Sequence, residues 1–173
     1  MQKIVFLDID GPIINLGCYG IDNGCSHARS VMNQSAIGFI NLLCHKTNAL
    51  VVTNSSHNPH SVNKFTTIDG DRVEIAPTDL REDLIRHGLK PQYFHKEWRT
   101  AYPLKMSGVN SHRLDAIDLW QVENGEADWI AFDDAIFTQD PRLLLVDFNE
   151  GITHALYIQA LKMFKVDDGL HFY

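Results

Sequence analysis

The chain is organised around the stretch Lys3-Ile4-Val5-Phe6-Leu7-Asp8-Ile9-Asp10-Gly11. The apolar run over residues 4–7 predicts a strand buried on both faces, as at the centre of a covered parallel sheet. Sheets of this kind place their chemistry just beyond the carboxyl ends of the strands, which is where Asp8 and Asp10 fall. Gly11 permits a sharp turn there and keeps a side chain out of the site.

The two aspartates are spaced so that both can face the same cleft, because residues i and i+2 of a strand point to the same side. Two carboxylates this close repel each other unless a cation lies between them or one of them stays protonated. Carboxylate oxygens suit Mg²⁺, and one aspartate could attack as a nucleophile while the other moves a proton. A strand that ends in a solvated Asp-Gly turn would have the same local sequence.

Length and composition favour an ordinary globular protein. The chain has 173 residues, of which 45% are hydrophobic and 21% are charged, so we expect one domain over residues 1–173. No apolar run approaches the ~20 residues of a membrane span, and the start of the sequence does not resemble a signal peptide. We therefore expect a cytoplasmic protein without a membrane partner. The three cysteines lack CxxC spacing, and the net charge of −7 gives no strong basic footprint for long nucleic acids.

Other segments alternate between helical and strand patterns. Residues 12–33 are expected to form a loop, which could be a small flap or cap insertion over the site or a surface excursion without a role. Helices are predicted over residues 36–46 after Ser35, from residue 77 to residue 87, over residues 112–122 after Ser111, and after Thr153. Strands are predicted over residues 49–52, 93–98, 129–132 and 143–146, with a small hairpin within residues 61–76.

The second buried strand ends in Thr53-Asn54-Ser55-Ser56. Hydroxyl and amide groups at a strand end suit phosphate oxygens, although they also occupy ordinary turns. Asn54, Ser55 and the nearby His57 are therefore candidate substrate contacts. The histidines show no HExxH-type arrangement, which argues against a histidine metal site.

A further buried strand, over residues 129–132, ends in a second acidic pair, Asp133-Asp134. Acids clustered at the carboxyl ends of two central strands are difficult to explain as turn chemistry alone. Arg113 lies in the first turn of a predicted helix, where the helix dipole disfavours a cation. Either this position is accidental or Arg113 serves a nearby anion.

This order of motifs resembles the haloacid dehalogenase superfamily of phosphotransferases and phosphatases. The matching segments are Phe6-Leu7-Asp8-Ile9-Asp10-Gly11, Val51-Val52-Thr53, a basic residue at Arg113 or Lys105, and Phe132-Asp133-Asp134. The later segments Leu145-Val146-Asp147 and Gly151-Ile152-Thr153 are similar to the phosphatase modules of nucleic-acid repair proteins.

The resemblance implies an α/β fold, with a Rossmann-like parallel sheet, helices on both faces and a minimal cap. It further implies that Asp8 is the nucleophile, that Asp10 is the general acid and base, and that Thr53 binds the phosphoryl group. Mg²⁺ would be held by Asp8, Asp133, Asp134 and the backbone carbonyl of Asp10. The third motif is usually Lys, so Arg113 is a departure if it fills that place, and Lys105 is the alternative.

A Mg²⁺-dependent phosphomonoesterase is the expected function, because an alkoxide leaving group needs the proton that a second aspartate can supply. The expected substrate is a nucleotide or a nucleic-acid terminal phosphate. The alternatives are a small-metabolite phosphatase of the same superfamily and a catalytically silent binding protein. Trp98, Tyr102 and Tyr93 could stack on a base, but packing within the protein is the simpler interpretation. The sequence leaves the oligomeric state open.

Overall fold

A parallel β-sheet forms the centre of the computed structural model, which describes residues 1–21, 31–55, 63–66, 72–75, 80–101 and 111–166. The five strands lie in the order β5-β2-β1-β6-β7, and all neighbouring pairs are parallel. Their bounds are β1 Gln2–Leu7, β2 Leu50–Thr53, β5 Phe94–Arg99, β6 Ala127–Asp133 and β7 Leu143–Leu145. This is the Rossmann-like α/β sheet that the sequence predicted.

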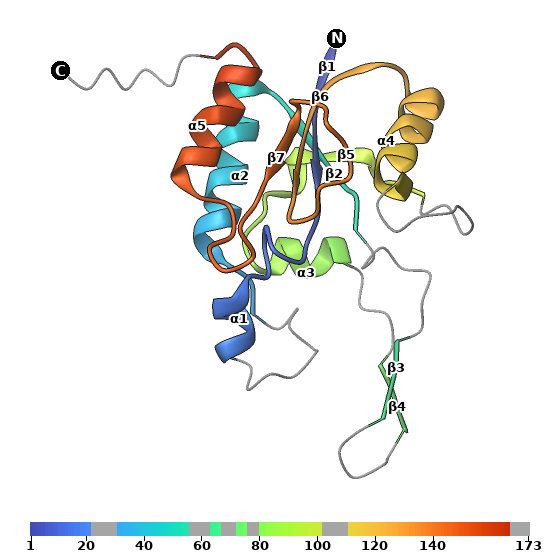
Figure 1. Cartoon of the computed structure of the whole chain (residues 1–173), viewed down its shortest axis with the longest axis vertical. Coiled ribbons are helices and arrows are strands. Elements are labelled where there is room, and N and C mark those ends of the chain that lie inside the picture. Colours follow the sequence, from blue (N-terminus) through green and yellow to red (C-terminus); the bar gives the residue numbers. More distant parts are fainter. Residues whose placement is uncertain (22–30, 56–62, 67–71, 76–79, 102–110, 167–173) are drawn as a thin grey trace, which may run out of the picture.

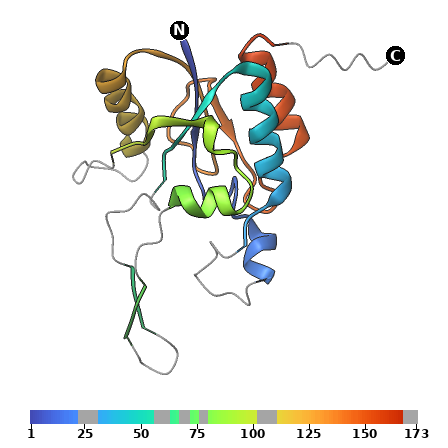
Figure 2. The same cartoon turned by 180° about the vertical axis from the view of Figure 1, so that it is seen from behind.

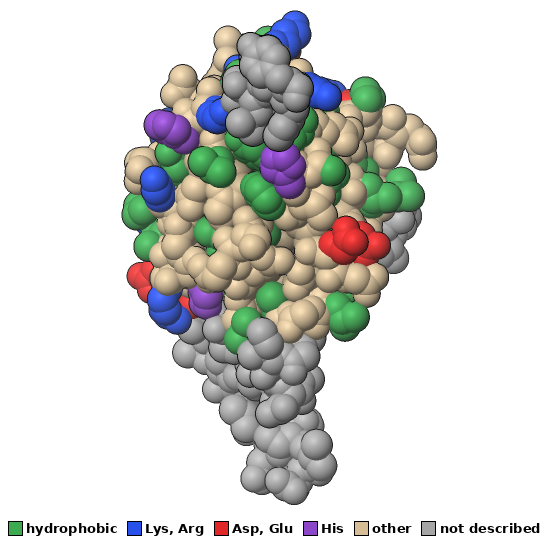
Figure 3. Space-filling view, turned by 90° about the vertical axis from the view of Figure 1, so that its left-hand side faces the viewer, with side chains coloured by type: hydrophobic (Ala, Val, Ile, Leu, Met, Phe, Trp, Pro, Cys, Tyr) green, Lys and Arg blue, Asp and Glu red, His purple; other side chains and the backbone are tan. Residues whose placement is uncertain are grey.

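Helices cover both faces of this sheet (Figures 1 and 2). Helix α2 (Gln34–Thr47) packs with α5 (His154–Met163) on one face, and α4 (Ser111–Asn124) lies on the other. The remaining described helices are α1 (Leu16–Ile21), α3 (Leu80–Arg86) and the short 3₁₀ turn η2 (Pro91–Tyr93). In the space-filling view of the α2 and α5 face, Lys and Arg side chains are dispersed among neutral and apolar ones (Figure 3).

The alternation of side chains along β1 divides the core in two. Val5 and Leu7 belong to the cluster that includes residues of α2 and α5, whereas Ile4 and Phe6 belong to the cluster that includes Ile117 and Trp120 of α4. The ring of Phe6 lies edge-on to that of Trp120, with the centroids 5.5 Å apart. Burying each such side chain contributes about 1.5–3 kcal/mol. The same alternation directs Asp8, two residues after Phe6, toward α4.

Capping side chains explain where two helices begin. The side-chain oxygen of Asn33 accepts hydrogen bonds from the amides of Ser35 and Ala36, so Asn33 caps α2 in place of the predicted Ser35. Thr153 caps α5 as predicted, accepting a hydrogen bond from the Leu156 amide at 3.4 Å.

Helix α1 was missed, and the prediction of a loop is wrong for residues 16–21. Gly17 and Gly20 disfavour helix in the local sequence. However, the side-chain oxygen of Asn15 accepts a hydrogen bond from the Cys18 amide at 3.3 Å and supports the first turn. The side-chain nitrogen of Asn15 also donates to the Glu150 carbonyl at 2.9 Å, which anchors α1 to a distant loop. Residues 22–30 lie outside the described part of the chain.

The predicted hairpin is present as two antiparallel strands, β3 (Asn63–Thr66) and β4 (Arg72–Ile75). It lies with α1 and α3 beyond the carboxyl ends of the sheet strands (Figure 1). Among the described residues no large cap is present, and α3 contributes Leu80 and Leu84 to the core. None of the helices described combines the length and the apolar character that crossing a membrane requires.

Candidate active site

Three carboxylates meet at the carboxyl ends of β1 and β6. Asp8, Asp133 and Asp134 each offer an oxygen, and these oxygens all lie within 4.8 Å of one another. The two strands are neighbours, with Leu7 in register with Phe132, and the Asp8 amide donates to the Phe132 carbonyl at 3.0 Å. Asp8 and Asp133 are buried, whereas Asp134 is partly exposed. The sheet therefore brings Asp8 of the first acidic pair next to both acids of the second, at the strand ends that the sequence predicted.

Arg113, in the first turn of α4, is the cation of this cluster. Its Nη1 atom lies 2.6 Å from Oδ2 of Asp8 and also donates to Oδ2 of Asp133. The two carboxylates offset the unfavourable interaction of this cation with the helix dipole. Arg113 thus serves nearby anions, which was one of the two interpretations of its position. The alternative, Lys105, lies outside the described residues.

Burial shifts the pKa values of the three acids upward, and a neighbouring carboxylate adds to the rise at Asp133 and at Asp134. Burial raises the pKa of Asp8, and the positive charge of Arg113 opposes that rise. Burial and the charge of Asp8 raise the pKa of Asp133 to about 7, again against the effect of Arg113. Burial also raises the pKa of Asp134, with a smaller contribution from the charge of Asp10. A cation bound among these groups would lower all three pKa values.

Backbone contacts hold the two acids of the second pair in different ways. Oδ1 of Asp133 accepts a hydrogen bond from the Ala135 amide at 2.8 Å, while its Oδ2 faces Arg113. Asp134 packs against Gly11, whose φ is +81°. A Cβ atom on Gly11 would lie 2.6 Å from the Cβ of Asp134, so Gly11 leaves the space that this acid occupies.

The donor set fits Mg²⁺. Hard divalent cations prefer oxygen ligands, and three carboxylates from the ends of two adjacent strands converge here. The carboxylate of Asp10 is not a member of this cluster, although its charge affects Asp134. The resemblance assigned Asp10 a backbone carbonyl ligand, which does not require its side chain to join the cluster.

Thr53, at the end of β2, and the residues that follow it lie beside the acids. Thr53 is fully buried, with its hydroxyl 3.4 Å from the Trp98 carbonyl. Ser55 is also fully buried, and its side chain lowers the pKa of Asp8 against the larger effect of burial. The side chain of Asn54 is engaged by partners within the protein. His57, the remaining predicted substrate contact, falls outside the described residues.

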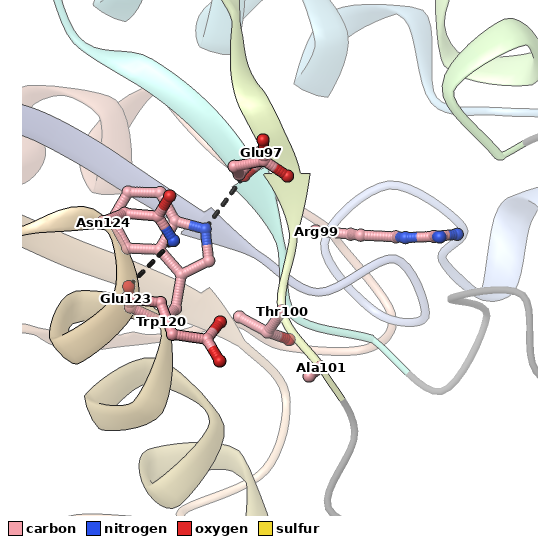
Figure 4. A pocket seen from close by; sticks show the side chains of 7 residues that line it. All are labelled: Glu97, Arg99, Thr100, Ala101, Trp120, Glu123 and Asn124. Atoms are coloured by element: carbon pink, nitrogen blue, oxygen red, sulfur yellow. Dashed lines mark hydrogen bonds between the residues drawn. The ribbon is translucent and has the colours of Figure 1, made fainter.

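A pocket of about 400 Å³ lies between the end of β5 and α4 (Figure 4). Its lining comprises Glu97, Arg99, Thr100, Ala101, Trp120, Glu123 and Asn124. The indole nitrogen of Trp120 donates to the Glu97 carbonyl at 2.9 Å, and the Arg99 side chain extends away from Trp120.

The aromatic residues considered for base stacking contribute to packing in the described structure. Trp98 lies edge-on to Phe94 with centroids 6.4 Å apart, and Tyr93 packs against the core. Tyr102 is outside the described residues. These contacts favour the simpler interpretation for Trp98 and Tyr93.

Comparison with known proteins identifies the family. No curated protein and no solved structure matched the chain. Residues 4–156 match the family model described as the HAD domain in Swiss Army Knife RNA repair proteins. The matched range contains both acidic pairs, Arg113 and every strand of the sheet but the first two residues of β1. With a five-stranded parallel sheet and an acidic cluster at its carboxyl edge, this chain belongs to the HAD domain family of Swiss Army Knife RNA repair proteins.

Proposed function

We propose that this domain is a Mg²⁺-dependent phosphomonoester hydrolase that acts on the terminal phosphate of a nucleic acid. The main support is the placement of Asp8, which is buried beside Arg113, Asp133 and Asp134 at the carboxyl edge of the sheet. Phosphoryl transfer depends mainly on positioning and charge neutralisation, and this cluster offers a nucleophile, a cation and metal ligands together.

Asp8 and Asp10 divide the covalent chemistry. A carboxylate oxygen of Asp8 attacks phosphorus, the bond from phosphorus to the ester oxygen breaks, and Asp10 gives its proton to that leaving oxygen. The product alcohol departs and leaves an aspartyl-phosphate. Asp10, now ionised, takes a proton from the water that attacks this phosphorus. Inorganic phosphate is released, and Asp8 and protonated Asp10 are regenerated.

The remaining residues of the site bind the phosphoryl group or the metal ion. Arg113 and the hydroxyls of Thr53 and Ser55 bind phosphoryl oxygens. Asp8, Asp133, Asp134 and the carbonyl of Asp10 would hold Mg²⁺, which would neutralise negative charge on the phosphoryl group. Lys105 and His57 remain candidates for further contacts.

The substrate class rests on two observations. The family description names RNA repair proteins, which supports a nucleic-acid end as the substrate. The described structure has no large cap over the sheet, which supports access for a long chain. We further propose that residues 1–173 act as one domain and that residues 12–33 form a flap beside the site.

Hydrolysis assays test this proposal directly. Purified protein with Mg²⁺ should release phosphate from p-nitrophenyl phosphate, and Asp8→Asn should abolish turnover because an amide is a poor nucleophile. Asp118→Asn changes an exposed acid on α4 in the same way and is the matched control, with activity expected to be unchanged. Equal rates for wild type and Asp8→Asn would disprove this mechanism.

Phosphorylated RNA oligonucleotides, mononucleotides and sugar phosphates should then be compared by kcat/KM. A preference for RNA ends supports the proposed substrate. Turnover of sugar phosphates alone would instead identify a small-metabolite phosphatase.

A further inference from the structure

Asn54 joins three elements of the sheet edge. It follows β2, and its backbone amide donates to the Leu7 carbonyl of β1 at 2.9 Å. Its side-chain nitrogen donates to the Arg113 carbonyl of α4 at 3.2 Å. Its side-chain oxygen accepts a hydrogen bond from the hydroxyl of Thr100, which follows β5, at 2.9 Å. We refer to these two side-chain hydrogen bonds, from Thr100 to Asn54 and from Asn54 to Arg113, as the Asn54 bridge.

The bridge lies inside the protein. Asn54 and Thr100 are each only 2% exposed. Thr100 is itself fixed, because its amide donates to the Thr53 carbonyl at 2.9 Å. A buried amide that uses its oxygen and its nitrogen on protein partners is poorly suited to binding substrate. This differs from the role expected for Asn54 as a substrate contact.

Both ends of Arg113 are therefore held by polar contacts. Asn54 binds its backbone carbonyl, and Asp8 and Asp133 bind its guanidinium. A long arginine side chain has many rotamers, so an anchored backbone narrows the positions that its guanidinium reaches. The bridge also ties the start of α4 to the segments that follow β2 and β5.

We propose that Asn54, held by Thr100, is a positioning residue that keeps the Arg113 guanidinium against Asp8 for phosphoryl transfer. This inference rests on the proposed function, since the role of Arg113 in catalysis is part of it. It assigns to Asn54 an effect on kcat, transmitted through Arg113, because small displacements of a charged group weaken its interaction with the transition state. A substrate contact would instead act mainly on KM.

The test uses Asn54→Ala and Thr100→Val, which remove the bridge from either side. Asn41→Ala is the control, because Asn41 of α2 forms a bridge of the same kind to the loop after α3 and contacts none of the acids in the described structure. Its side-chain nitrogen donates to the Gly88 carbonyl at 2.9 Å, and its side-chain oxygen accepts from the Lys90 amide at 3.0 Å. Each variant loses side-chain hydrogen bonds between elements, which are exposed for Asn41 and buried or partly buried for Asn54 and Thr100, so thermal unfolding measures the structural effect of each variant.

Expected results separate positioning from structural support. Asn54→Ala and Thr100→Val should each lower kcat for p-nitrophenyl phosphate by about tenfold with KM within about twofold, while Asn41→Ala should leave kcat unchanged. In an Arg113→Ala background, Asn54→Ala should lower kcat by less than about twofold, because the residue it positions is already gone. Full additivity in that background, or a rise in KM with kcat unchanged, would overturn the proposal.

Hydrogen exchange tests the bridge without any measurement of activity. If Asn54→Ala does not fold, Thr100→Val still allows this test. Amides of residues 113–117 should exchange faster in Thr100→Val than in wild type, whereas in Asn41→Ala they should not. Unchanged exchange would overturn the bridge as an anchor of α4. If wild type hydrolyses no phosphomonoester but exchange accelerates as expected, the proposed function fails while the anchoring role stands.

Discussion

Gly11 and Asp134 occupy adjoining space at the edge of the sheet, with no room for a side chain on the glycine. A Cβ atom at Gly11 would lie 2.6 Å from the Cβ of Asp134 and 2.9 Å from its Cγ. Gly11 also has a φ of +81°, a conformation that side chains disfavour. The turn after β1 and the acid after β6 therefore constrain each other.

Gly11→Ala should displace the Asp134 carboxylate and lower kcat/KM by about 100-fold or more, because metal ligands and nucleophile must keep their mutual geometry. The Mg²⁺ concentration for half-maximal activity should rise in the same variant. Steady-state kinetics across a Mg²⁺ titration measure both effects.

Gly38→Ala is the control for this substitution. Gly38 lies in α2 and has nothing within 4 Å of an added Cβ, so alanine should raise stability by about 0.5–1 kcal/mol and leave kcat unchanged. Wild-type kinetics in Gly11→Ala would show that activity does not depend on the position of the Asp134 carboxylate.

Replacing Arg113 should separate charge from geometry. Arg113→Ala should lower kcat by about 10³-fold, because a cation that stabilises phosphoryl oxygens is lost. Arg113→Lys should retain part of the activity, since it keeps the charge but not the fork of donors. The exposed ion pair of Arg142 with Asp140 supplies the control, and Arg142→Ala should have wild-type kcat. Equal activities in Arg113→Ala and wild type would remove Arg113 from the mechanism.

Stability without metal should fall as the pH rises toward and past neutrality. An acid whose pKa is raised in the folded state binds its proton more tightly there, so protonation favours folding. For Asp133 this advantage is complete below the unfolded value of 3.8 and is lost as the pH passes about 7.

Added Mg²⁺ should therefore raise the Tm more at about pH 8 than at about pH 5.5, because cation and protons compete for the same carboxylates. Differential scanning fluorimetry with and without Mg²⁺ measures this difference. A Tm shift of the same size at both pH values would contradict the linkage.

Gly151→Ala should destabilise the loop that supports the turn after Gly11. Gly151 has a φ of +76°, and an added Cβ would lie 3.1 Å from the side-chain nitrogen of Asn15 and 3.2 Å from the Pro12 carbonyl. We expect a loss of about 2–3 kcal/mol in the free energy of unfolding, from strain and crowding together.

Gly125→Ala separates the two causes of that loss. Gly125 has a φ of +97° but nothing within 4 Å of an added Cβ, so it should lose only about 1 kcal/mol from strain. Urea unfolding of both variants gives the comparison, and equal losses would show that crowding at Gly151 contributes nothing.

Several elements were predictable because their signals are local. The apolar runs before Asp8 and Asp133 predicted buried parallel strands, and parallel strands bring the residues at their carboxyl ends to one edge of the sheet. The helices around Ile37 and Ile117 were predictable from apolar spacing in the same way. Helix α1 was not predicted because its glycines disfavour a helix locally. The hydrogen bond that anchors it, from Asn15 to the Glu150 carbonyl, joins residues far apart in the sequence.

The sequence by itself determined the fold class, the two acidic pairs and the edge of the sheet at which they meet. Only the tertiary structure decided that Arg113 contacts Asp8, that the Asn54 side chain forms hydrogen bonds within the protein and that the absence of a side chain at Gly11 leaves space for Asp134. Periodicity and burial follow from the pattern of neighbouring residues, so they can be predicted from the sequence. Contacts between residues far apart depend on how helices and strands pack, which no local pattern records.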